Sequence, residues 1–181
     1  SSGTDYGWSC WHKDLGGNYG IWLDKTSARN ISMWAGYTNI SSTVFSPPDL
    51  LYGNESSQTY INYLWAEIPG FSKFGSVTLS ASANDSFINL GFRPRWFMIK
   101  GTDSTSNWIV LDSTRDPFNF VDQELFANLP NAENAATSTY SFDFLSNGVK
   151  CRNQGLTGSF IYAAFAEAPS FNLYGAQANA R

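Results

Sequence analysis

The stretch YLWAEIPGFSKFG, residues 63–75, is repeated in altered form as AAFAEAPSFNLYG, residues 163–175. An ungapped alignment of residues 60–75 with residues 160–175 contains six identities, whereas unrelated sequences of ordinary composition would share about one. The identical pairs are Ile61/Ile161, Ala66/Ala166, Glu67/Glu167, Pro69/Pro169, Phe71/Phe171 and Gly75/Gly175. The chain therefore contains an internal duplication, and equivalent residues are 100 positions apart.

Aromatic rings also recur at this offset. The recurring rings are Trp8/Trp108, Trp65/Phe165, Phe71/Phe171 and Phe74/Tyr174. A residue that is kept in both units most simply performs the same packing role twice. We therefore expect these shared rings to form the core, and rings found in one unit only to face partners.

The composition favours β-structure. Aromatic residues make up 17% of the 181 residues and charged residues only 14%. Strands are enriched in aromatic and β-branched residues, whereas the strong surface helix formers Lys, Glu and Arg are scarce here. Ring packing is therefore expected to supply most of the cohesion.

The composition also argues against two classes of partner. The net charge is −4 and no run of Lys or Arg is present, so nothing in the sequence would neutralise a polyphosphate backbone. No run of about 18 apolar residues occurs, and the first residues have neither the charged start nor the apolar core of a secretion signal. We expect no nucleic-acid partner and no membrane insertion.

The two cysteines, Cys10 and Cys151, are not related by the repeat. One pair in a chain of this length is not a disulfide framework. Two free buried thiols are the favoured reading, and a single disulfide is the alternative.

Several short apolar runs predict strands joined by tight turns. Residues 93–101 and 107–114 flank the polar turn TDSTS and predict a hairpin, and two further strands, 76–80 and 86–92, flank an Asn-Asp turn. Asn147-Gly148 predicts a second hairpin, and GSFIYAAFAEAP predicts a closing strand. The only candidate helical turn is centred on residues 122–128, before Pro130.

About six strands per 100 residues is the density of an all-β sandwich. We predict a tandem pair of lectin-like, jelly-roll-like antiparallel β-sandwich units, at residues 1–70 and 71–181. Only seven residues precede Trp8, whereas three predicted strands precede Trp108, so the first unit is expected to lack its opening strands. Its open edges would then be covered by upstream residues or by a neighbouring subunit.

Six segments together carry a family resemblance: GWSCWHKDLG, STVFS, WAEIPGFSKFGS, GFRPRWFMIKGTDSTSNWIVLDSTRDPFN, DFLSNGVKCR and YAAFAEAPSFNLYGAQANAR. They resemble the duplicated, Trp-rich β-module found toward the ends of tail-fibre and tailspike-like proteins of tailed bacteriophages. The resemblance implies a lectin-like sandwich on the virion surface, assembled as a trimer, that meets host surface polysaccharide. It supplies no site residues. Cys10, Cys151 and the segment SPPDLLYG depart from the family pattern.

Catalytic readings have little support in the sequence. His12 is the only histidine, and its repeat equivalent is Asp112, so a Ser/His/Asp site built on it is disfavoured. Glu67 and Glu167 could be a carboxylate pair, but a repeated residue more simply has a repeated structural role, such as accepting backbone N–H groups at the Ala-Glu-X-Pro corner. We expect no enzyme activity.

The cluster DSTRDP predicts a structural ion pair in which Arg115 binds Asp112 or Asp116. No zinc or calcium-loop spacing is present, and no cofactor is expected. An opportunistic calcium ion among Asp103, Asp112 and Asp116 stays open.

Carbohydrate binding is the function that the residue types favour, because sugars stack their C–H faces on aromatic rings while polar side chains bind the hydroxyls. The candidate ligand-binding residues are the unshared rings and a neighbouring amide: Tyr19, Trp22, Trp34, Tyr37, Asn39 and Phe118, with Phe120 beside it. Packing of these rings against a neighbouring domain is an equally good reading. The alternative function is a purely structural virion domain, such as a spacer, trimer clamp or capsid decoration.

Overall fold

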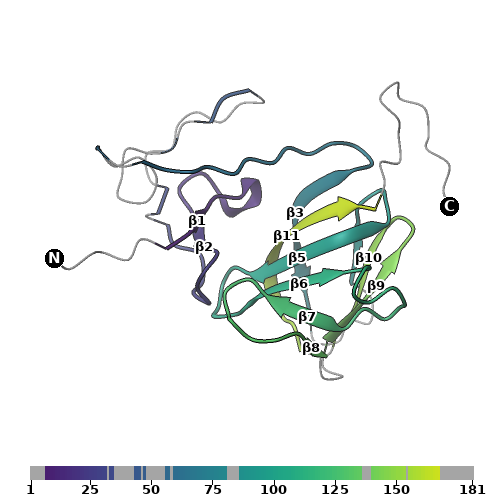
Figure 1. Ribbon diagram of the computed structural model, residues 1–181. Coiled ribbons are helices and arrows are strands. Elements are labelled where there is room, and N and C mark those ends of the chain that lie inside the picture. Colours follow the sequence, from purple (N-terminus) through teal and green to yellow (C-terminus); the bar gives the residue numbers. More distant parts are fainter. Residues whose placement is uncertain are drawn as a thin grey trace.

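The structure is a computed structural model that describes residues 7–31, 33–34, 43–45, 47, 56–57, 59–80, 86–135, 140–153 and 155–167. Within these residues the chain is all-β, with one 3-10 turn (Figure 1). The elements are β1 (Ser9–Cys10), η1 (Lys13–Leu15), β2 (Ile21–Trp22), β3 (Ser72–Leu79), β4 (Ser86–Asn89), β5 (Pro94–Gly101), β6 (Trp108–Asp112), β7 (Gln123–Phe126), β8 (Asn134–Ala135), β9 (Tyr140–Leu145), β10 (Gly148–Asn153) and β11 (Gly158–Ala166). None of the helices in this described part has the length and apolar character needed to cross a membrane.

Two antiparallel sheets form a sandwich. One has six strands in the order β3-β11-β5-β6-β7-β8, and the other has three in the order β4-β10-β9. Every strand pair is antiparallel. The last described strand, β11, therefore lies between β3 and β5, inside the larger sheet (Figure 1).

The core between the two sheets is built largely from rings. Phe97 of β5 is fully buried, and its ring centroid lies 5.9 Å from that of Phe142, 6.3 Å from that of Phe144 and 6.0 Å from that of Tyr162. Phe142 and Phe144 come from β9, so these contacts join the two sheets. Such ring contacts contribute about 0.5–1.5 kcal/mol each beyond the area they bury.

A third layer covers the other face of the six-stranded sheet. Residues 7–31, the N-terminal module, carry β1, η1 and β2, and β1 pairs with β2. Leu15 and Ile21 of this module form a second buried cluster with Trp108 of β6 and Ile161 of β11. The indole Nε1 of Trp108 donates a hydrogen bond to the carbonyl oxygen of Trp22 at 2.7 Å, so the polar atom of the buried ring is satisfied.

The β5–β6 turn ties the N-terminal module to the sandwich. The Lys100 Nζ donates to the Thr26 carbonyl oxygen at 3.2 Å, and the Arg29 backbone N–H donates to the Thr102 carbonyl oxygen at 2.9 Å. Burial lowers the pKa of Lys100 to about 8, but its ammonium also donates to the carbonyl oxygen of Gly101 and to the Ser106 Oγ. A buried cation with three acceptors is the arrangement that limits its desolvation cost.

The all-β prediction is confirmed, and so are both hairpins and the closing strand. β5 pairs with β6 across the TDSTS turn, and β9 pairs with β10 across the two-residue turn Ser146–Asn147, after which Gly148 opens β10. β11 forms over nearly the predicted length. The cysteines are both free, with Cys151 buried and Cys10 half-buried.

One prediction about local structure is wrong. Residues 123–126 form strand β7 and not a helical turn, because pairing of Leu125 and Phe126 with β6 outweighs a weak local helix preference. The two strands predicted around the Asn-Asp turn form as β3 and β4, and they lie in different sheets. The intervening residues 81–85 are outside the described part of the chain.

The expectation that shared rings are buried fails in the first unit. Trp108 is buried, but its equivalent Trp8 is 56% exposed. Trp65 is 65% exposed, while its equivalent Phe165 is half-buried. The physical reason is that a repeated sequence has a repeated environment only if the same neighbours surround both copies. The other two shared rings of the second copy, Phe171 and Tyr174, lie outside the described residues.

The division into units at residues 70/71 stays a prediction. β3 begins at Ser72, and all strands of the two large sheets follow it. Among the described residues before Ser72, the regular elements are β1, η1 and β2. The second predicted unit therefore supplies the whole observed sandwich, and the first supplies the layer that covers it.

Gly75 is a glycine because Tyr162 lies across it. The two residues are opposite each other in the β3–β11 pair. A Cβ atom built on Gly75 would lie 2.4 Å from the Tyr162 Oη and 2.6 Å from the Cζ, which is too close for any side chain.

We predict that Gly75→Ala destabilises the protein by about 1–3 kcal/mol, the usual cost of forcing extra volume into a packed site. The control is Ser76→Ala, at the next, exposed position of the same strand, which should change stability by less than about 0.5 kcal/mol. Urea unfolding followed by fluorescence measures both variants. Equal midpoints for the two variants would contradict the role assigned to Gly75.

Candidate functional site

An aromatic groove of about 340 Å³ lies between the N-terminal module and the six-stranded sheet. Its floor comes from β3, β5, β6 and β11, and its walls come from β1, from the residues just after β1 and from Trp65. The lining residues are Cys10, Trp11, His12, Trp65, Phe74, Trp96, Met98, Trp108, Ile161, Tyr162, Ala163 and Phe165. A volume of this size falls within the range of small-molecule sites.

Phe165 is the centre of the ring cluster at one end of the groove. Its ring centroid lies 5.6 Å from that of Trp96 and 5.8 Å from that of Phe74. These three residues come from β11, β5 and β3, which are adjacent strands. Strand pairing therefore places the rings, and their positions do not depend on loop conformation.

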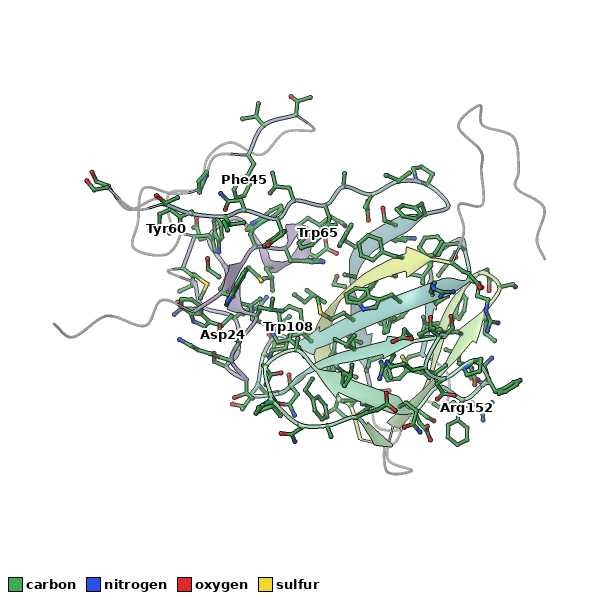
Figure 2. The ribbon with its side chains drawn as sticks, in the orientation of Figure 1. Asp24, Phe45, Tyr60, Trp65, Trp108 and Arg152 are labelled. Carbon is green, nitrogen blue, oxygen red and sulfur yellow. The ribbon has the colours of Figure 1, made fainter. Side chains whose placement is uncertain are left out.

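A row of three exposed rings continues from the groove onto the surface. Trp65 lines the groove, and its ring centroid is 6.2 Å from that of Tyr63 with an interplanar angle of 20°. Tyr63 is in turn 6.2 Å from Trp8 with an angle of 26°. Figure 2 shows Trp65 on the extended segment that leads into β3, with Trp108 on the sheet below it in this view. We call Trp8, Tyr63 and Trp65 the ring row.

His12 is the only histidine, and it lines the groove. Its Nδ1 accepts a hydrogen bond from the Asp14 backbone N–H at 3.2 Å, which caps η1, and its Nε2 lies 3.3 Å from the Tyr162 carbonyl oxygen. Burial lowers the His12 pKa, against an opposing effect of the Tyr162 carbonyl and Asp14. The imidazole is therefore neutral at pH 7, with its Nε2 proton directed to the carbonyl.

Cys10 and His12 line the same groove, but they lack the properties of a thiolate–imidazolium pair. Burial raises the pKa of the Cys10 thiol to about 12, and Asp24 adds to this effect. A thiol with such a pKa is protonated at neutral pH and is a poor nucleophile. The groove therefore offers a neutral, largely apolar surface.

Glu67 supports the groove wall. Its Oε1 accepts a hydrogen bond from the Phe74 backbone N–H at 3.0 Å, which is the structural role that the sequence favoured for this repeated residue. Burial raises the pKa of Tyr162, and the Glu67 charge adds to this effect. Burial lowers the pKa of His12, and there the Glu67 charge is one of the weaker opposing effects. Glu167 has a different partner, Arg95, at 3.4 Å on the surface, so the two glutamates do not form a carboxylate pair.

The DSTRDP cluster forms the predicted structural clamp. The Arg115 Nε lies 2.5 Å from the Asp112 Oδ2 and its Nη1 lies 2.7 Å from the Glu133 Oε2. Asp116 accepts a hydrogen bond from the Asp122 backbone N–H at 2.8 Å. Asp103 is bound to Arg29, and the described residues contain no group of acidic, His or Cys side chains placed to hold a metal ion.

The structure separates the ligand-binding candidates that the sequence suggested. Trp34 is 4% exposed and packs against Phe45 with their centroids 5.9 Å apart, so its ring is covered by protein, and its role in ligand binding stays a prediction. Tyr37 and Asn39 lie outside the described residues. Trp22 and Tyr19 are half-buried and lie under cations, with the Lys25 Nζ 4.3 Å from the Trp22 ring and the Arg29 guanidinium 4.8 Å from the Tyr19 ring.

Phe118 is 79% exposed but does not line the groove. It lies in the β6–β7 connection, near Phe120, whose ring packs beneath the Arg152 guanidinium at 5.9 Å. Of the candidates that the structure describes, Tyr19, Trp22, Trp34 and Phe118, none lines the groove. The sequence analysis missed the groove residues because it assigned the shared rings to the core. One signal could have found them: the stretch 60–65 is apolar and has too few charged or turn-forming residues for an ordinary loop, which indicates a contact surface.

Together, the fold and the groove define an all-β sandwich domain with an aromatic site of ligand size on one sheet face. Residues 1–169 match DUF7483, a domain of unknown function. The match covers most of the chain, and the protein therefore belongs to the DUF7483 family. No curated protein matches the chain, and no solved structure matches it.

One buried acidic group lies away from the groove. Glu124 of β7 is almost fully buried, and its Oε1 has no hydrogen-bond partner among the described residues. Burial raises its pKa to about 7, and the nearby Asp122 contributes in the same direction. Because the folded pKa is above the unfolded value of about 4.5, the folded protein holds a proton between pH 4.5 and 7 that the unfolded chain has released.

We predict that the Glu124 contribution to stability falls as pH rises from about 4.5 to about 7, since the folded state binds the extra proton in that window. Glu124→Gln removes this dependence, so the difference in urea midpoint between variant and wild type should shift in favour of the variant as pH rises from 5 to 8. Taking the difference cancels the titration of His12 and the other carboxylates. A difference that is constant with pH would show that Glu124 titrates normally.

Proposed function

We propose that the protein is a non-catalytic binding domain that takes host surface carbohydrate along the ring row and into the aromatic groove. The observation that carries this proposal is the continuity of three exposed, nearly parallel rings with a groove of about 340 Å³. Exposed large rings in a contiguous set are uncommon on a surface without an interaction function.

Ring stacking at the groove fits the chemistry of sugars. The C–H faces of a pyranose pack on aromatic rings, and successive sugar residues of a polysaccharide can pack on successive rings of the row. The His12 imidazole also lines the groove, where its two nitrogens are hydrogen-bonded to the Asp14 N–H and the Tyr162 carbonyl. The groove therefore presents ring faces to a sugar.

A non-catalytic function is supported by the state of the titratable groups in the groove. The Cys10 thiol is protonated, the His12 Nε2 is directed to a backbone carbonyl, and Glu67 binds a backbone N–H. Glycoside hydrolysis uses two carboxyl groups about 5–9.5 Å apart on either side of the bond. The described groove lining contains no carboxylate.

The setting that we propose is a phage virion. It rests on the resemblance of segments such as WAEIPGFSKFGS and YAAFAEAPSFNLYGAQANAR to modules of tail-fibre and tailspike-like proteins. In that setting the domain would lie at the tail, in a trimer, and its ligand would be host surface polysaccharide.

A purely structural virion domain is the second candidate, and one observation favours it. In the second unit, Trp108 is the equivalent of Trp8 and is buried beneath the N-terminal module. The face that bears the ring row could be covered by a neighbouring subunit in the same way. In that case the rings would serve assembly and not ligand binding.

We predict that Trp65→Ala weakens binding to host polysaccharide by about two- to tenfold, corresponding to the loss of roughly 0.5–1.5 kcal/mol of ring stacking. The measurement is a glycan array followed by titration of the best ligand. The matched control is Phe118→Ala, which removes an even more exposed ring outside the groove and should leave affinity unchanged.

Three results would count against this proposal. No binding by the folded wild-type protein to arrays or host cells would remove the carbohydrate function. Loss of binding in Phe118→Ala alone would move the site to the β6–β7 connection. Loss of the oligomer in Trp65→Ala, with no ligand found, would favour the structural candidate.

A further inference from the structure

The lining of the aromatic groove carries no formal charge. Among the described residues that line it, none is an aspartate, glutamate, lysine or arginine. Burial raises the pKa of the Cys10 thiol to about 12 and also raises the pKa of Tyr162, whereas it lowers the pKa of His12, so all three side chains are neutral at pH 7. A charged ligand would lose its hydration in this groove without gaining an ion pair. We therefore expect the part of a ligand that enters the groove to be uncharged.

The nitrogens of His12 are already bound within the protein. The Nδ1 accepts a hydrogen bond from the Asp14 backbone N–H at 3.2 Å. The Nε2 lies 3.3 Å from the Tyr162 carbonyl oxygen, and this contact occupies the carbonyl as well. The imidazole is the strongest side-chain acceptor of the lining, and it is not available to a ligand hydroxyl.

The Tyr162 hydroxyl lies on the other side of the sheet. Ile161 and Ala163 line the groove, and successive residues of a strand face opposite sides of a sheet. The Tyr162 ring accordingly belongs to the core between the two sheets, where its centroid lies 6.0 Å from that of Phe97. Its Oη is 2.4 Å from the position of a Cβ atom on Gly75. The main chain of Tyr162 therefore borders the groove, and its hydroxyl does not.

The remaining polar atoms of the described lining side chains are indole donors and sulfur. An indole N–H donates but cannot accept, and that of Trp108 already donates to a carbonyl oxygen of the N-terminal module at 2.7 Å. Trp65 and Trp96 have the same donor-only chemistry, and the sulfur atoms of Cys10 and Met98 are weak acceptors. A hydroxyl group in the groove would leave its proton without a good acceptor, which is unfavourable. An ester has no such proton.

The groove has room for a substituent and borders the ring row. A closed apolar cavity of about 150 Å³ holds one benzene molecule, and the groove measures about 340 Å³. Trp65 belongs both to the groove lining and to the ring row. A sugar stacked on the ring row can therefore keep its hydroxyls in water while one substituent reaches the groove.

We propose that the groove takes the O-acyl group of an acylated polysaccharide whose sugar rings lie on the ring row. An O-acyl ester is uncharged, its chain is apolar, and its oxygens accept hydrogen bonds but donate none, so it matches each property of the lining. This inference rests on the proposed function, and it narrows the ligand from carbohydrate in general to O-acylated carbohydrate. Acidic sugars and sugars with only free hydroxyls lack these properties.

The ligand class is tested with bacterial polysaccharides presented in pairs, one member native and O-acylated and the other treated with mild alkali. The treatment removes O-acyl esters and leaves the glycan chain. The wild-type protein should bind the acylated member of its best pair about five- to tenfold more tightly, because the acyl group leaves water. Affinities are measured by titration against the immobilised glycans.

Two glutamine variants show whether this preference arises in the groove. Met98 and Val110 are opposite each other in the β5–β6 pair and both are half-buried, but only Met98 lines the groove. Met98→Gln adds an amide acceptor of similar size, so it should lose most of the preference for the acylated form. Val110→Gln places the same amide on the adjacent strand and should keep the wild-type preference.

A smaller substitution covers the case in which Met98→Gln does not fold, as judged by urea unfolding. Ala163 is opposite Met98 in the β5–β11 pair and also lines the groove. Ala163→Ser adds a hydroxyl acceptor with little volume, and it should reduce the preference in the same direction.

The outcomes separate this inference from the proposed function. Equal or weaker binding of the wild type to the acylated members would overturn the inference and leave carbohydrate binding intact. A preference that survives in both Met98→Gln and Ala163→Ser would place the acyl group outside the groove and would also overturn it. Absence of binding to every glycan would instead remove the proposed function, and this inference with it.

Discussion

The structure depends on covering both faces of the six-stranded sheet. One face packs on the three-stranded sheet through Phe97, Phe142 and Phe144, and the other packs on the N-terminal module through Trp108 and Ile161. Strands β5 and β11 are consequently apolar on both sides and lack the alternation of a half-exposed strand. Removing either covering layer would expose a large apolar surface to water, and the folded state would lose about 25 cal/mol of stabilising free energy for each Å² exposed.

This constraint also produces the groove. The N-terminal module covers the sheet at Trp108 and Ile161 but does not fill the space toward Phe165, and the ring of Trp65 borders what is left. The groove therefore forms where the N-terminal module, the six-stranded sheet and the segment that carries Trp65 meet. Its shape depends on the hydrogen bonds by which Lys100 and Trp108 hold the module. Residues within the sheet fix its floor, which makes the floor rigid, whereas the wall supplied by Trp65 belongs to an unpaired segment.

Local signals in the sequence predicted the hairpins well, because TDSTS and Asn147-Gly148 fix turns between neighbouring strands. They failed for β7, where Glu124, Leu125 and Phe126 read as weakly helical and only pairing with β6 makes them a strand. The duplication was visible in the sequence, but it could not show that Ile61 and Ile161 have different neighbours. The groove could not be predicted from the sequence for the same reason: its lining residues range from Cys10 to Phe165, and no local sequence pattern indicates contacts between residues so far apart.

The position of β11 has a consequence for how the chain is made. β11 is the last described strand, yet it separates β3 from β5 in the larger sheet. Residues of β3 pair with residues about 80–90 positions later in the chain: Leu79 pairs with Gly158, and Ser72 pairs with Phe165. On the ribosome, the β5–β6 and β9–β10 hairpins can form early, but the sheet closes only after residue 166 has emerged. Until then, the apolar side chains of β3 and the N-terminal module are exposed in the nascent protein, so the incomplete chain is more prone to aggregation than the finished one.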